Sequence, residues 1–149
     1  RSGSFASAEL GAYLRQLATQ AFRAQVSASG MVALQLDLVL ASVNLDMATT
    51  CGLLVNELIS NSLKHGFPQG RSGQVLIGLQ VVSNPEGGHD LLRLRVSDTG
   101  IGLPPDFEPR CLQSLGMQLV SDLVRQLGGS LEIGPGPGAE FVVTFARQT

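Results

Sequence analysis

The stretch LLVNELISNSLKHGFP, residues 53–68, predicts a helix with an unusual polar face. Glu57 and Asn61 are one helical turn apart, and Lys64 and His65 follow one turn later, so the four side chains project from nearly one face. This face offers a carboxylate, an amide oxygen, an ammonium group and an imidazole, which are groups that magnesium and phosphate chemistry uses. A solvated helix face is the alternative, and the rest of the chain decides between the two.

The composition is that of one packed globular domain. The chain has 149 residues, of which 44% are hydrophobic and 15% charged. Its formal net charge is −2 and it has no basic run, so nothing indicates binding to nucleic acid or to an anionic membrane surface. Cys51 and Cys111 are far apart and show no metal-ligand spacing, which argues against disulfides and zinc and favours a reducing, cytoplasmic setting.

Hydrophobic periodicity predicts the order helix, strand, helix, two strands, helix, two strands. The first eight residues are expected to be a disordered tail or an expression remnant, with one folded domain over 9–149. The predicted helices are 9–26, about 47–65 and 116–127, and the predicted strands are 31–39, 74–83, 90–97, 130–133 and 140–146. This order favours an α/β two-layer sandwich, in which three helices cover one face of a mixed, mostly antiparallel sheet of about five strands.

A second motif, Asp98-Thr99-Gly100-Ile101-Gly102, follows directly after a strand of alternating pattern. A carboxylate only accepts hydrogen bonds, so Asp98 could bind the exocyclic amino group of an adenine and would reject a carbonyl at that position. Gly100 and Gly102 would let the backbone approach a flat ring or phosphates closely. A surface turn after a hairpin is the alternative explanation for this motif taken alone.

Two further segments complete the pattern. Ser114-Leu115-Gly116-Met117-Gln118 opens the last predicted helix, and a glycine in the first turn leaves backbone N–H groups available for a phosphate. Gly116 could equally serve only a turn or close helix packing. The segment at 138–141, GAEF, enters the last strand.

In this order and at these spacings, the four segments resemble the N, G1 and G2 boxes and the terminal glycine segment of the GHKL, or Bergerat, ATP-binding fold. NELISNSLKHGFP and SLGMQLVSDLVRQLGGSLEI look most like the catalytic (HATPase_c) domains of bacterial sensor histidine kinases of the HisKA_2/HWE-like type. The resemblance covers the chain from about residue 10 to residue 145. It implies binding of ATP and Mg²⁺ and transfer of the γ-phosphoryl group to a histidine.

The resemblance also implies roles for single residues of the predicted central helix. Asn61 matches the asparagine that coordinates the magnesium ion. Glu57 stands where a group could take or relay a proton from the attacking nucleophile. Lys64 and His65 match a pair that contacts the phosphates and the ribose.

The other implied site residues lie after the hairpin. Asp98 is the adenine carboxylate, and Gly100 and Gly102 shape the pocket floor. The segment of Leu115, Gly116 and Met117 would close over the phosphates. Ile101 and Leu119 are candidates for the adenine wall, or for the core.

Two features depart from the wider family. The lid at 103–115 is short, which is similar to the HisKA_2 group, and Arg110 is its only basic residue. Ala139 replaces a threonine that helps a water molecule bridge Asp98 and adenine in many members, so nucleotide could bind more weakly.

The resemblance implies partners as well. His65 belongs to the implied nucleotide site and His89 to a turn, so the phosphoacceptor histidine is expected on a separate dimerisation domain, with a response regulator downstream and this domain alone mostly monomeric. Two other hypotheses remain open: a serine kinase of the anti-sigma-factor type, and a degenerate GHKL module that binds a protein partner without ATP.

Overall fold

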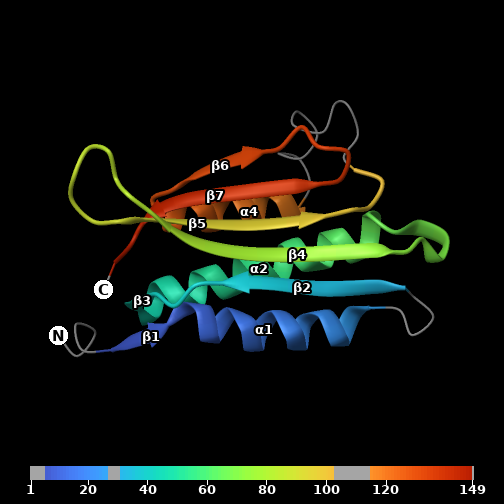
Figure 1. The fold of residues 1–149 in the computed structure, drawn as a ribbon, viewed down its shortest axis with the longest axis horizontal. Helices are drawn as coiled ribbons and strands as arrows, with labels where there is room; N and C mark the ends of the chain where they lie inside the picture. The colour runs from blue at the N-terminus through green and yellow to red at the C-terminus, as the bar shows by residue number, and fades with distance from the viewer. Residues whose placement is uncertain (1–5, 27–30, 103–114, 149) are drawn as a thin grey trace.

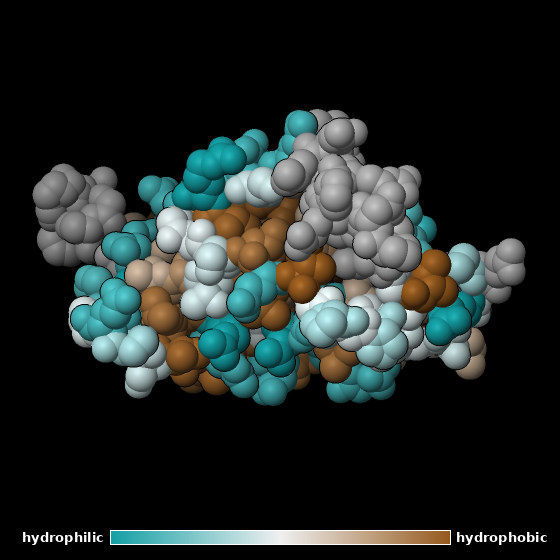
Figure 2. Space-filling view, turned by 90° about the horizontal axis from the view of Figure 1, so that it is seen from above, coloured by the Kyte–Doolittle hydropathy of each residue, from teal (hydrophilic) through white to brown (hydrophobic). Residues whose placement is uncertain are grey.

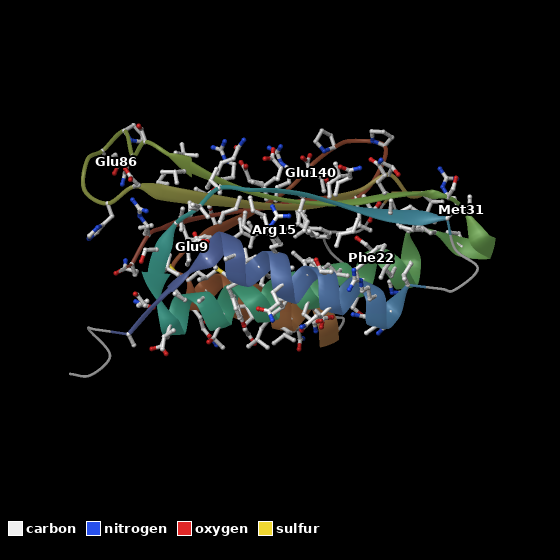
Figure 3. All side chains as sticks on the ribbon, turned by 60° about the horizontal axis from the view of Figure 1, so that its bottom comes forward. Glu9, Arg15, Phe22, Met31, Glu86 and Glu140 are labelled. Carbon is white, nitrogen blue, oxygen red and sulfur yellow. The ribbon has the colours of Figure 1, made fainter. Side chains whose placement is uncertain are left out.

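The computed structural model describes residues 6–26, 31–102 and 115–148. In these residues the main sheet has five strands in the order β2-β4-β5-β7-β6, and the α-helices are α1, α2 and α4. Figure 1 shows the strands side by side, with α2 and α4 behind them and α1 next to β2, and Figure 3 shows the helices gathered on one face of the sheet. The predicted α/β two-layer sandwich is therefore confirmed.

The sheet is mixed, with one parallel pair. β2 runs parallel to β4, whereas β4–β5, β5–β7 and β7–β6 are antiparallel. The parallel pair needs a crossover, and α2 provides it by connecting the two strands across one face of the sheet. The strand bounds are Val32–Leu38 for β2, Gly73–Val82 for β4, Leu91–Asp98 for β5, Ser130–Ile133 for β6 and Glu140–Ala146 for β7, close to the predicted ranges.

The three helices are Leu10–Gln25 (α1), Leu45–His65 (α2) and Leu115–Gln126 (α4). α2 starts two residues before the predicted position because Asn44 caps it: its side-chain oxygen accepts a hydrogen bond from the Met47 N–H at 2.8 Å. Its last turn carries the basic residues Lys64 and His65, a placement at which positive charge interacts favourably with the negative end of the helix dipole. Gly66 follows as the C-cap.

The core lies between the helices and the sheet. α2 contributes its largest share, because buried side chains recur along it at helical spacing. The largest fully buried side chains come from every layer: Phe145, Leu10, Leu14, Leu54, Leu58, Ile59, Ile77, Leu79, Leu92, Leu94, Val43 and Val55. Seen from above, apolar surface is also visible between polar borders (Figure 2).

A two-stranded ribbon was not predicted. β1 (Ser7–Glu9) pairs antiparallel with β3 (Ser42–Asn44). Ser7 and Ala8 belong to the segment predicted as a tail, but here they form a strand. The Glu9 carboxylate accepts hydrogen bonds from the Ala12 and Ala41 N–H groups and so connects this ribbon to α1. Residues 1–5 of that tail lie outside the described residues.

Two smaller points complete the description. The loop after α2 contains one turn of 3₁₀-helix, Pro68–Gly70. Among the helices that the structure describes, none combines the length and the apolar character needed to cross a bilayer.

Candidate functional site

The end of β5 carries a buried carboxylate with one free oxygen. Asp98 is only 6% exposed. Its Oδ1 atom accepts hydrogen bonds from the Gly100 N–H at 2.9 Å and from the Ala139 N–H at 3.3 Å. Its Oδ2 atom is buried and has no hydrogen-bond partner among the described residues. A buried acceptor without a partner is costly, so this oxygen is suited to a donor group that arrives with a ligand.

The turn after Asp98 is packed against the end of α2. The Ile101 N–H donates to the Gly66 carbonyl at 2.9 Å. A Cβ on Gly100 would lie 2.2 Å from the same carbonyl oxygen, so only glycine allows this approach. Gly102 has a φ of +85°, and a Cβ there would lie 2.3 Å from the Pro137 carbonyl oxygen. The two predicted glycines therefore let the turn lie between α2 and the β6–β7 loop.

Glu57 and Asn61 face the first turn of α4. A Cβ on Gly116 would lie 2.6 Å from Glu57 Oε2 and 3.7 Å from Asn61 Oδ1. The Asn61 Nδ2 group donates to the Met117 sulfur at 3.7 Å. A thioether sulfur only accepts, so this contact leaves the Asn61 oxygen for another partner. Residues 57 and 116, far apart in the sequence, thus form one surface.

The remaining predicted site residues lie in the last turn of α2, in the turn after Asp98 and in α4. Lys64 and His65 are exposed in the last turn of α2. Ile101 is 54% exposed and Leu119 is 43% exposed, so neither belongs to the core. Leu115 is the first residue of α4. Arg110 and the rest of the predicted lid up to residue 114 lie outside the described residues.

The arrangement can hold a molecule with a hydrogen-bond donor at one end and anionic groups at the other. Asp98 supplies an acceptor within a glycine-lined turn, and Asn61 supplies an amide oxygen of the kind that Mg²⁺ binds. The described residues contain no cluster of three or more His, Cys, Asp or Glu side chains that could hold a metal alone. A magnesium ion here would need oxygens from a bound ligand, which is its usual mode of binding with nucleotides.

Two residues of the site were not predicted as such. Gly66 was not predicted as part of the site, yet its carbonyl accepts a hydrogen bond from the Asp98 turn and a Cβ on it would lie 3.3 Å from Asp98 Oδ2. Ala139 was noted for a missing hydroxyl, yet its N–H binds the carboxylate. Both contribute backbone atoms, which no side-chain pattern reveals.

Comparisons with known proteins agree with this geometry. Residues 48–149 match the family model of histidine kinase-, DNA gyrase B- and HSP90-like ATPases. The chain is 34% identical over 127 residues to blue-light-activated histidine kinase 2 of Erythrobacter litoralis, covering 85% of this chain and 35% of that protein.

Solved structures show the same fold. The histidine kinase domain of the blue-light activated kinase EL346 of Erythrobacter litoralis has a TM-score of 0.78 and 31% identity, over 93% of this chain and 61% of that chain. Full-length ShkA, solved in complex with AMPPNP, has a TM-score of 0.76 and 24% identity, over 97% of this chain and 32% of that one. The chain is therefore similar to the catalytic domains of sensor histidine kinases and spans about a third of the length of such a protein. It belongs to the family of histidine kinase-, DNA gyrase B- and HSP90-like ATPases.

Proposed function

We propose that this chain is the ATP- and Mg²⁺-binding catalytic domain of a two-component sensor histidine kinase. Its activity would be transfer of the γ-phosphoryl group of ATP to a histidine on a separate dimerisation domain. The observation that carries the proposal is the buried Oδ2 atom of Asp98, which has no hydrogen-bond partner within the described part of the chain and lies in a turn whose close packing requires glycines. The similarity to histidine kinase domains at 31% and 34% identity supports the same conclusion.

At the base end, Asp98 would accept the exocyclic amino proton of adenine. Its Oδ1 atom already holds two backbone N–H groups, which leaves Oδ2 for the ligand. A carboxylate is stabilised by a hydrogen-bond donor and is repelled by a carbonyl oxygen. Adenine would therefore be preferred over guanine at this position.

At the phosphate end, Asn61 would be the protein ligand of the magnesium ion. The hydrogen bond to Met117 uses the Nδ2 group of the amide, so Oδ1 is the atom that would bind the metal. When bound, Mg²⁺ would neutralise charge on the phosphate oxygens. Lys64 and His65 would add positive or hydrogen-bonding groups at the exposed end of the same helix face.

Glu57 would act on the acceptor. Its carboxylate lies beside the first turn of α4, next to Asn61, so it is near the position proposed for the metal and phosphates. There it could take or relay the proton of the attacking imidazole. Gly116, Met117 and Leu115 open α4 at this point and would offer backbone N–H groups to the phosphates.

The phosphoacceptor would come from a partner domain of the same kinase. His65 lies in the proposed site, and His89 lies in the β4–β5 loop, which Figure 1 places at the other end of the sheet. The parent kinase would be of the HisKA_2/HWE-like type, with a response regulator downstream and this domain in the cytoplasm. The domain alone would be mostly monomeric.

Calorimetric titration with a non-hydrolysable ATP analogue, with and without Mg²⁺, tests nucleotide binding. Saturable binding that Mg²⁺ strengthens and that Asp98→Asn removes is the expected result. Absence of binding at millimolar nucleotide would overturn the proposal and favour a module that binds only protein partners.

The acceptor is tested separately, by supplying radiolabelled ATP and a dimerisation domain that carries the acceptor histidine. Phosphohistidine is labile in acid and stable in base, whereas phosphoserine is stable in acid. Acid-labile label on the dimerisation domain is expected. Acid-stable label would instead identify a serine kinase.

A further inference from the structure

The last step of the β4–β5 ladder is completed by a side chain. Val75 pairs with Asp98, so Gln74 and Thr99 form the next pair outward. The Thr99 N–H donates to the Gln74 carbonyl at 3.0 Å, as a regular antiparallel ladder requires. The return bond is different, because the Gln74 N–H donates to the Thr99 hydroxyl oxygen, at 2.9 Å.

Because the Thr99 hydroxyl oxygen accepts this bond in place of the Thr99 carbonyl oxygen, the chain can leave the strand directly after Thr99. In a regular pair of this kind, the two residues exchange two N–H to C=O bonds, and the second bond would hold the Thr99 carbonyl in the sheet. Since the hydroxyl takes that place, the backbone turns away directly after Thr99. Gly100 then bonds back to Asp98 Oδ1, and Ile101 reaches the Gly66 carbonyl.

The hydroxyl occupies a space that a glycine keeps open. A Cβ on Gly73 would lie 2.5 Å from Thr99 Oγ1 and 2.5 Å from Cε1 of Phe67. Real Cβ atoms do not approach other atoms so closely, so a side chain at position 73 would displace the hydroxyl or the ring. Gly73 and Thr99 therefore form one contact, built from β4 and from the turn that carries the carboxylate.

We propose that Thr99 is a positioning residue of the nucleotide site, acting through Asp98 and Gly100. By ending the ladder with its side chain, it fixes the point at which the turn begins and thus the direction of the free Asp98 oxygen. The inference rests on the proposed function, because the quantity it governs is affinity for the adenine base.

Thr99→Val removes the hydroxyl and keeps the β-branched shape, whereas Thr99→Ser keeps the hydroxyl. We expect Thr99→Val to weaken binding of the ATP analogue by roughly three- to tenfold, the usual effect of one neutral hydrogen bond. Thr99→Ser should bind within about twofold of the unchanged protein. Adenosine should lose affinity by the same factor as the ATP analogue, because the defect lies at the base and not at the phosphates.

Thr19→Val is the matched control. The Thr19 hydroxyl donates to the Arg15 carbonyl at 2.7 Å within α1, so its loss removes a hydrogen bond away from the site. Nucleotide affinity should be unchanged in this variant. Gly73→Ala acts on the Thr99 contact from the other strand, so its effect on affinity and that of Thr99→Val should not add in the double variant.

Two outcomes would overturn the inference alone. Thr99→Val could bind adenosine as the unchanged protein does, or Thr99→Ser could lose as much affinity as Thr99→Val. Each leaves the proposed function intact, provided that the unchanged protein binds and Asp98→Asn does not. If the unchanged protein fails to bind nucleotide, the proposed function fails and the inference with it.

Discussion

The carboxylate of Glu57 lies directly against the backbone of Gly116, with Oε2 only 2.6 Å from the position that a Cβ on that glycine would occupy. The two residues belong to different helices, and their contact sets how closely α4 approaches the polar face of α2. Because the obstructing atom is the end of a flexible side chain, an alanine at this position would move Glu57 more readily than it would move the helices.

Gly116→Ala should therefore separate stability from activity. Alanine is favoured over glycine in a helix by up to about 1 kcal/mol, so the free energy of unfolding should stay equal or rise. Phosphoryl transfer to a dimerisation domain should fall by roughly tenfold, because the added methyl group displaces Glu57 and covers the backbone of residue 116. Urea unfolding and an acid-labile phosphate assay measure the two quantities.

Gly78→Ala is the control for this variant. A Cβ on Gly78 would meet nothing closer than 3.8 Å, and the residue lies within β4. Transfer should be unchanged in this control. Equal transfer in Gly116→Ala and in the unchanged protein would argue against a role of Glu57 in the reaction.

Asp98→Asn should abolish adenine recognition without unfolding the domain. The amide oxygen can still accept from Gly100 and Ala139, but the amide nitrogen would face the adenine amino group with a second donor. A buried mismatch of this kind costs about 2–3 kcal/mol, so affinity for the ATP analogue should fall by roughly 30- to 160-fold.

Asp37→Asn in β2 is the matched change at an exposed position and should leave affinity unaltered. Circular dichroism and thermal melting show whether Asp98→Asn is folded. A folded Asp98→Asn variant with full affinity would contradict the assignment of Asp98.

Asn61→Ala should remove the effect of Mg²⁺ and leave the base end intact. Affinity for the ATP analogue without Mg²⁺ should stay within about twofold, and the increase on adding Mg²⁺ should vanish, because the Asn61 amide oxygen is the proposed protein ligand of the metal. Transfer should be lost. Asn56→Ala, at an exposed position of the same helix, is the control. A normal Mg²⁺ response in Asn61→Ala would place the metal elsewhere.

Strands and helices with long periodic patterns could be predicted from the sequence, because burial on one face imposes a repeat on the side chains. The predicted strand at 140–146 agrees with β7 at both ends. The three-residue strands β1 and β3 are too short to show a repeat, so they were missed. Leu40 continues the alternation of β2, yet it is 77% exposed because the strand ends at Leu38.

The site could be predicted where its chemistry lies in side chains. The structure places Glu57 and Asn61 beside Gly116 and Asp98 in the glycine turn, and the roles of these residues stay predictions. The contacts of Gly66 and Gln74 could not be predicted, because backbone carbonyl and amide groups are present in every residue and leave no mark on the sequence. Only the topology of the sheet brings them to the end of β5.

Gly102→Ala should destabilise the domain more than Gly88→Ala. Both glycines have a φ of +85°, where a side chain costs about 1–2 kcal/mol. A Cβ on Gly88 would meet nothing within 4 Å, whereas one on Gly102 would lie 2.3 Å from the Pro137 carbonyl oxygen. The difference in the free energy of unfolding between the variants, measured in urea, isolates the close contact. Equal losses in the free energy of unfolding would mean that the β6–β7 loop moves away from the added methyl group without a loss of stability.

Burial of Cys51 should protect its thiol and make stability fall at high pH. Burial raises the pKa of Cys51 from 9.0 to about 12, because the core disfavours the thiolate. The unfolded chain loses this proton near pH 9 and the folded chain does not, so the contribution to stability is intact below pH 9 and falls as the pH rises toward 12.

The free energy of unfolding should therefore decline less steeply above pH 9 in Cys51→Ala than in the unchanged protein. In a Cys111→Ser background, a maleimide reagent should label Cys51 only as fast as the domain unfolds. Rapid labelling of the folded protein would show that the thiol is accessible.

The way in which Asp98 is held has a consequence for synthesis of the protein on the ribosome. The turn that carries this carboxylate is fixed by Gly66 from α2, by Gln74 from β4 and by Ala139, which lies 41 residues further along the chain. Until Ala139 has left the exit tunnel, Asp98 Oδ1 lacks one of its two donors and β5 lacks its neighbour β7. If Asp98 binds nucleotide as proposed, a nascent chain acquires this ability only when β7 is complete, and a ligand present during synthesis would stabilise folded domains and not partial ones.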